Sequence, residues 1–207
     1  MAISNVGELK SELSAYLFHQ RLANRYDNCI KLFETSANTR LRVRQMETFA
    51  DLTLSAGGSA NLPTDYLTWR TVLWTDNTPF VELEYVHPAY MNTSNPSIRG
   101  NPKLFMIVGS IINIKPEQTT PPAVRMHYYQ KIPTLADAAN STTNWLLTEY
   151  PNAYLFGVLT ELAAMQRNAE MAQLYKARRD EAFAEITQRY AMTTGATSPR
   201  VRTAEYY

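Results

Sequence analysis

Hydrophobic residues recur at helical spacing near the start of the chain. One series begins at Leu9. Ser4 or Asn5 precedes it as the candidate N-cap, and Glu8 lies within the first turn. A second apolar face consists of Tyr26, Cys29, Ile30, Phe33 and Ala37. This spacing predicts two helices before about Arg42, joined near His19–Arg21.

The pattern changes to alternation between about residues 46 and 132. Thr, Val, Phe and Trp are frequent there, and strands are predicted in "METFADLTL", "LTWRTVLW", "TPFVELEYV" and "VRMHYYQKIP". Gly57-Gly58 permits a turn with positive φ, and Gly109-Ser110 is placed to turn a hairpin in "KLFMIVGSIINIKP". In the third strand, Glu82 and Glu84 alternate with apolar residues. A β-rich insertion is therefore predicted.

Helical spacing returns after the segment "TLADAANSTTN". A short helix is predicted over 144–150, capped by Thr142 or Thr143, and Pro151 suits the first turn of the next helix. An apolar stripe then runs through Tyr154, Leu155, Val158, Leu159, Leu162, Met165, Leu174, Phe183 and Ile186. Its extent predicts one helix of about 40 residues, roughly 60 Å long. A helix longer than its core requires suggests a structural arm or an oligomer contact.

These patterns predict an α+β protein. It has a helical bundle with a long C-terminal helix, an inserted antiparallel β-domain and an extended C-terminal arm. The expected segments are the N-terminal helices at 1–45, the β-domain at 46–133, the C-terminal helices at 134–192 and the arm at 193–207. The arm has no helical or strand period, and Gly195 and Pro199 interrupt it.

Composition restricts the classes of function. The 207 residues include 20 basic and 19 acidic side chains, so a net charge of +1 gives no bulk attraction to nucleic acid or membranes. Cys29 is the single cysteine, which excludes an internal disulfide and a cysteine-based metal site. No apolar run reaches the roughly 18 residues of a membrane span, and no signal-peptide pattern is evident. A soluble, intracellular protein is expected.

No arrangement typical of catalysis stands out. The three histidines are scattered, and no nucleophile elbow, phosphate loop or dinucleotide fingerprint occurs. Glu82 and Glu84 would share a strand face near His87 and could form a carboxylate–imidazole metal site, although a solvated strand face explains them better. No catalytic residue, cofactor site or metal ligand is therefore assigned, and the chain is not expected to be an enzyme.

Charged residues give candidates for contacts with other molecules. Arg40, Arg42 and Arg44 alternate, so in a strand they would share one face. They could meet phosphate, but the neutral net charge favours pairing with acids on a neighbouring subunit. A salt-bridged helix surface supplies further interface candidates, namely Arg178, Arg179, Asp180 and Glu181.

The order of features resembles the head-to-tail adaptor, or connector, proteins of tailed bacteriophages. The N-terminal helix pair is followed by three segments that match the family's pattern. These are "RLRVRQMETFADLTLSAGGSANLPTDYLTWRTV", "GNPKLFMIVGSIINIKP" and, most specific, "YYQKIPTLADAANSTTNWLLTEYPNAYLFGVLTELAAM". Together they extend over most of the chain, about residues 5 to 190.

The resemblance implies a structural protein of the virion, located at the head–tail interface and assembled in the host cytoplasm. It would form a ring, usually dodecameric, that binds the portal protein, receives tail or nozzle proteins and continues the DNA channel without sequence-specific binding. No membrane partner or cofactor is implied. The long helix and the segment before it would contribute five residues to the bundle core, namely Trp145, Leu146, Tyr154, Leu155 and Leu162.

The C-terminal arm is expected to dock on the portal. No family motif transfers to it residue by residue, so the expected contacts rest on composition and position, and they are Arg200, Val201, Arg202, Tyr206 and Tyr207. Two alternatives stay open from the sequence. One is a DNA-binding module that uses Arg40, Arg42 and Arg44, and the other is a virion-associated hydrolase that uses Glu82 and Glu84.

Overall fold

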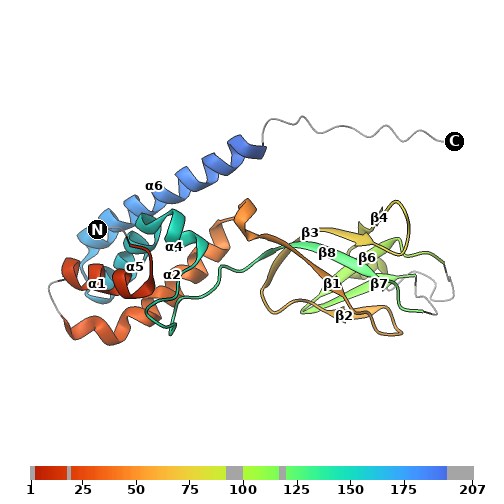
Figure 1. Ribbon diagram of the computed structural model, residues 1–207, viewed down its shortest axis with the longest axis horizontal. Helices are drawn as coiled ribbons and strands as arrows, with labels where there is room; N and C mark the ends of the chain where they lie inside the picture. The colour runs from red at the N-terminus through yellow and green to blue at the C-terminus, as the bar shows by residue number, and fades with distance from the viewer. Residues whose placement is uncertain (1–2, 18–19, 92–99, 117–119, 195–207) are drawn as a thin grey trace. The chain divides into compact units, whose positions relative to one another are not determined.

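The chain divides into two compact units, which Figure 1 shows as a group of helices and a group of strands. The helical unit comprises residues 1–45 and 132–207, and the β unit comprises residues 46–131. The computed structural model describes residues 3–17, 20–91, 100–116 and 120–194. Helices and two sheets occur together, which confirms the predicted α+β class.

Helices from both ends of the chain build the helical unit. They are α1 (Val6–Leu17), a 3-10 helix (Gln20–Arg25), α2 (Tyr26–Arg40), α4 (Trp145–Glu149), α5 (Pro151–Met165) and α6 (Ala169–Thr194), with a 3-10 turn (Arg44–Met46) at the boundary. The α6 helix ends at Thr194, two residues into the segment that was predicted to be the arm.

Local capping explains where α1 and α4 begin. The Oδ1 atom of Asn5 accepts a hydrogen bond from the Glu8 amide at 2.9 Å, while the Glu8 carboxylate accepts one from the Ser4 amide at 2.7 Å. The predicted cap of α4 was wrong, because Asn144 rather than a threonine accepts the Leu147 amide, at 2.9 Å. The same Asn144 side chain also donates to the Pro133 carbonyl, which fixes its position.

The prediction of one helix of about 40 residues was also wrong. Residues 166–168 separate α5 from α6, and Arg167 takes a left-handed φ of 60°. The amide of Asn168 returns to the Ala163 carbonyl, and its Oδ1 atom accepts the Met171 amide at the start of α6. The α6 helix consequently folds back along α5, as the stacking of Phe156 on Tyr175 indicates.

The core of the helical unit draws on α1, α2, α4, α5 and α6. Phe33 lies at its centre, edge-on to Tyr154 at 4.8 Å and stacked with Phe183 at 6.1 Å between ring centroids. Gly157 of α5 gives this ring its space, since an added Cβ would lie 2.0 Å from a ring carbon. Other fully buried members are Val6, Leu9, Leu13, Cys29, Ile30, Leu146, Leu147, Val158, Leu159 and Leu162.

The β unit is built from two four-stranded sheets. The first has the order β1 (Glu47–Leu52), β8 (Val124–Gln130), β3 (Tyr66–Trp74) and β4 (Val81–Glu82). The second has the order β2 (Ser59–Asn61), β7 (Ile111–Lys115), β6 (Leu104–Val108) and β5 (Glu84–Tyr85). The hairpin at Gly109-Ser110 is confirmed, with Gly109 at φ 61°, whereas the short β2 was not predicted.

The predicted third strand is divided between the two sheets. Val81–Glu82 pairs with β3, and Glu84–Tyr85 runs parallel to β6. Leu83 lies between them, buried, with its amide bonded to the Val72 carbonyl. One strand was therefore the wrong reading, because alternation does not reveal a change of sheet. A short helix, α3 (Pro88–Met91), follows.

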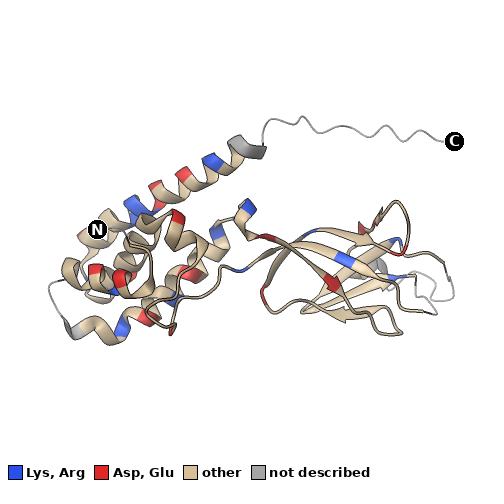
Figure 2. Cartoon of the chain, in the orientation of Figure 1, with Lys and Arg blue, Asp and Glu red and all other residues tan. Residues whose placement is uncertain are grey.

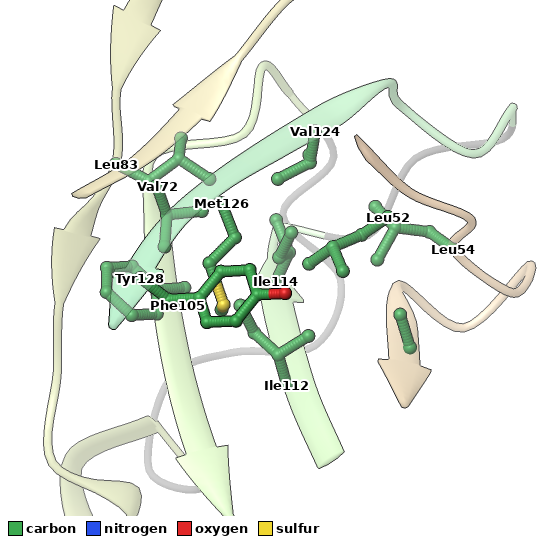
Figure 3. Close-up of a cluster of buried hydrophobic side chains, with 11 residues drawn as sticks. Leu52, Leu54, Val72, Leu83, Phe105, Ile112, Ile114, Val124, Met126 and Tyr128 are labelled. Carbon is green, nitrogen blue, oxygen red and sulfur yellow. The ribbon is translucent and has the colours of Figure 1, made fainter. Parts of the chain in front are cut away.

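Side chains from both sheets meet in a single apolar core, drawn in Figure 3. Val72, Val124 and Met126 come from the first sheet, and Phe105 and Ile112 come from the second. Val124, Met126 and Tyr128 alternate along β8 and are all buried, so one face of this strand points into the core. The β unit thus has a hydrophobic core of its own, as expected for an insertion that folds as a separate body.

Candidate assembly surfaces of the helical unit

Charged residues of both signs occur along α6, as Figure 2 shows. One of these, Asp180, links α6 to α2. Arg40, the last residue of α2, donates to the Asp180 carboxylate, which also accepts two bonds from Arg179 at 3.0 and 3.1 Å. Partial burial acts to raise the pKa of Asp180, but the bonds from Arg40 and Arg179 outweigh it and hold the pKa below its usual value. Arg40 also lies over the Phe183 ring, 5.7 Å from its centroid.

A shallow groove opens beside this cluster, with a volume of about 640 Å³. We call it the α2–α6 groove. Its lining consists of Arg40, Leu41, Asp180, Phe183, Ala184, Thr187, Gln188 and Ala191. Leu41 and Phe183 are almost fully buried and form an apolar floor, whereas Ala184 is exposed. Sequence reasoning missed this groove, since its two walls are separated by about 140 residues.

The three alternating arginines do not form a row. They would share one face only in a strand, whereas Arg40 ends a helix and Arg44 begins a 3-10 turn. Arg42 donates to the carbonyls of Asn38 and Leu41, so it satisfies backbone acceptors at the end of α2. Among the described residues, Arg44 alone of the three makes no hydrogen bond or ion pair, and it borders a small hollow with Arg189 and Tyr150.

Two of the four charged interface candidates on α6 pair with each other on the surface of the helix. Arg178 and Glu181 form a loose i,i+3 pair at 3.5 Å, and both side chains are well exposed. Exposed pairs of this kind contribute little to stability. Arg179, by contrast, is buried beside Asp180, so it belongs to the cluster with Arg40.

A buried polar network crosses the helical unit, and no sequence pattern predicted it. The Glu34 carboxylate of α2 accepts bonds from the Thr134 hydroxyl at 2.6 Å, the Leu135 amide at 2.6 Å and the Tyr154 hydroxyl at 2.9 Å. Tyr154 in turn accepts from the Asn144 amide group at 2.7 Å. Burial raises the pKa of Glu34, although these three bonds act to lower it.

Residues expected in the bundle core differ in burial. Leu146, Tyr154, Leu155 and Leu162 are buried, while Trp145 is partly exposed. The Trp145 indole nitrogen is itself buried and has no hydrogen-bond partner among the described residues. The portal-docking candidates Arg200, Val201, Arg202, Tyr206 and Tyr207 lie outside the described residues.

The two glutamates considered for chemistry do not form a site. Glu82 and Glu84 are both exposed, and they lie on strands of different sheets rather than on one strand face. His87 follows them and accepts a bond from the nearby Ala89 amide at 3.3 Å. Within the described part of the chain, no three His, Cys, Asp or Glu side chains are placed to hold a metal ion.

Comparison with known protein families identifies a match. A family model described as "SU10 adaptor protein" matches residues 4–203 of the chain. No curated protein matches the sequence significantly. Across the residues described by the structure, every helix is too short or too polar to cross a membrane.

Proposed function

The chain belongs to the SU10 adaptor protein family, and from this premise we propose that it forms an oligomeric ring that joins the portal of a phage head to the tail. The observation that carries the proposal is the extent of the family match, residues 4–203 of 207. The ring would be a dodecamer, located in the virion, that contacts portal and tail or nozzle proteins. It would be assembled in the host cytoplasm.

The ring would also continue the channel through which DNA passes. A net charge of +1 suits this role, because a channel that binds phosphate strongly would retain DNA rather than let it move. Arg40 and Arg42 support the same view, since both are engaged inside the helical unit rather than displayed as a basic row. The proposed role is therefore mechanical and needs no catalytic group.

The segment 193–207 would dock on the portal. Its first two residues are the last two of α6, and its arginines and tyrosines are residue types that anchor interfaces. Among the α6 residues whose side chains the structure describes, the last buried one is Ile186, which precedes the segment by seven positions. Removing the segment is thus expected to leave folding unaffected.

Mass photometry and co-sedimentation test this proposal. The full chain is measured alone and with the portal protein of the same phage, next to a variant that lacks residues 193–207. We expect a ring-sized species of the full chain, alone or on the portal, and a truncated chain with an unchanged circular dichroism spectrum but no portal binding. A full chain that ignores the portal would overturn the adaptor role, and truncated chain that co-sediments fully would overturn the docking role of the segment.

A further inference from the structure

The α6 helix carries a second exposed surface that the bundle does not use. Its residues follow each other at spacings of three and four, so they lie on one face of the helix. We call this face the α6 outer stripe, and it consists of Met171, Leu174, Arg178, Glu181 and Glu185. All five side chains are exposed, and Leu174 reaches 51% exposure.

The stripe and the α2–α6 groove lie on the two flanks of the row that α6 buries. This row runs through Tyr175, Arg179, Ala182 and Ile186, and Phe183 is buried beside it. From Leu174 onward the outer stripe precedes the row by one residue in each turn. Most of the groove follows the row by one or two residues, at Asp180, Phe183, Ala184, Thr187 and Gln188. One residue corresponds to about 100° around a helix. A rigid α6 therefore cannot bring its own stripe into its own groove.

The two surfaces are complementary in chemistry. The groove has an apolar floor of Leu41 and Phe183, and the stripe offers an exposed Leu174. In the cluster beside the groove, Arg40 and the buried Arg179 set two guanidinium groups against the one carboxylate of Asp180, a local charge of +1. On the stripe, two glutamates stand against one arginine, a local charge of −1. Surfaces of this kind attract each other and reject their own copies.

We propose that the α6 outer stripe of one copy docks in the α2–α6 groove of the next copy. The contact is head-to-tail, so each copy uses one stripe and one groove, and the assembly can close into a ring. The inference rests on the proposed ring and assigns the surfaces that hold its subunits together. It also explains why exposed apolar residues occur on a helix that already buries another face.

Two variants, each blocking one surface, test the contact. Leu174→Glu places a carboxylate in the apolar part of the stripe, and Ala184→Arg places a long side chain over the groove. Both positions are exposed, so circular dichroism should match the wild type. Each variant alone is expected to weaken self-association at least about tenfold in Kd, as sedimentation velocity measures it.

Mixing the two variants gives the sharpest result. One intact groove and one intact stripe remain between them, so an equimolar mixture should form dimers and nothing larger. Leu32→Glu and Ala15→Arg are matched controls, because they make the same changes at exposed positions of α2 and α1. Both controls are expected to assemble like the wild type.

Engineered cysteines cover the case in which assembly requires the portal. Leu174→Cys mixed with Ala184→Cys should give a disulfide-linked dimer under mild oxidation, with portal present or absent, and neither variant alone should. Cys29 will not interfere, because it is fully buried and burial raises its pKa to about 11. A mixture that cross-links no more than its components would overturn the inference.

Failure of this contact is distinguishable from failure of the ring. If both blocking variants assemble normally, the assigned surfaces are wrong while the ring stands. If Ala184→Arg loses portal binding but keeps its self-association, the groove is a portal site and the inference is wrong. If the wild type is monomeric both alone and on the portal, and the cysteine pair stays unlinked, the ring and the contact fall together.

Discussion

Glu34 connects three parts of the helical unit that are far apart in the sequence. Its carboxylate receives bonds from the segment that returns from the β unit, through Thr134 and Leu135, and from α5 through Tyr154. It is only 4% exposed, and each of these partners is a donor. Both carboxylate oxygens therefore accept hydrogen bonds, although burial disfavours the charge.

Glu34→Gln is expected to change the free energy of unfolding little near pH 4, because the amide resembles the protonated carboxyl in shape and in carrying a donor. The folded-state pKa of Glu34 is raised, so the wild type binds more protons folded than unfolded and loses stability as pH rises above about 4.3. The variant lacks this titration and should therefore become the more stable of the two toward neutral pH, as urea unfolding measures it. Glu170→Gln on exposed α6 controls for the lost carboxylate, and a wild type that becomes more stable than the variant as pH rises would contradict this account.

Gly157→Ala should destabilise the chain, against the usual helical preference. Alanine in place of glycine ordinarily stabilises a helix by about 1 kcal/mol. Here the new methyl group would overlap the Phe33 ring, which Tyr154 and Phe183 hold in place, so a net loss of about 1–3 kcal/mol is expected. Thermal or urea unfolding measures it. In a Phe33→Leu background the same substitution should cost clearly less, and equal costs in both backgrounds would rule out the overlap.

Among the elements, the turn between α5 and α6 has the largest effect on the fold. It converts an expected rod into an antiparallel pair, in which Arg189 near the end of α6 reaches the Tyr150 hydroxyl at the start of α5. With 26 residues against 15, α6 still extends past α5. The shape of the unit thus depends on the three residues 166–168.

Arg167→Gly should stabilise this turn. Arg167 follows α5 and has a φ of 60°. This backbone conformation costs free energy for a residue with a Cβ, whereas glycine adopts it without that cost. We expect the free energy of unfolding to rise by about 0.5–1 kcal/mol, measured by urea denaturation. The same change at Arg178, inside α6, should instead destabilise by about 1 kcal/mol and serves as the control. A loss of stability at both positions would show that the side chain of Arg167 matters more than its backbone.

Element-level patterns could be predicted where spacing alone decides the structure. Local causes determine the helical spacing that begins at Leu9, the hairpin at Gly109-Ser110 and the start of α5 at its proline. Positions decided by distant partners could not be predicted. The chain passes from one sheet to the other at Leu83, whose amide donates to the Val72 carbonyl. Arg40 pairs with Asp180, which lies 140 positions away in the sequence. The α2–α6 groove belongs to this second group, since neither wall is special alone.

At the scale of the molecule, the β unit is attached through two neighbouring strands. It begins with β1 and ends with β8, and these strands pair along six positions from Glu47 with Tyr129 to Leu52 with Val124. Antiparallel partners lie about 5 Å apart. The first and last strands of the β unit therefore lie side by side, so the two ends of the insertion are close together.

Each unit is expected to fold without the other. Residues 46–131 should give a strand-rich circular dichroism spectrum and unfold cooperatively, because their core draws on both of their own sheets. Residues 1–45 joined to 132–207 by a short Gly-Ser linker should keep their helical spectrum. Aggregation of both pieces, with the intact chain well behaved, would show that the units depend on each other.

The adjacent ends of the insertion also bear on how such a protein can change over generations. A segment whose two ends emerge side by side can be exchanged by recombination for another with the same spacing, while the host helices continue undisturbed. Selection could then act on the two parts separately. We expect related phages to share the helical part of this chain while differing in the inserted part.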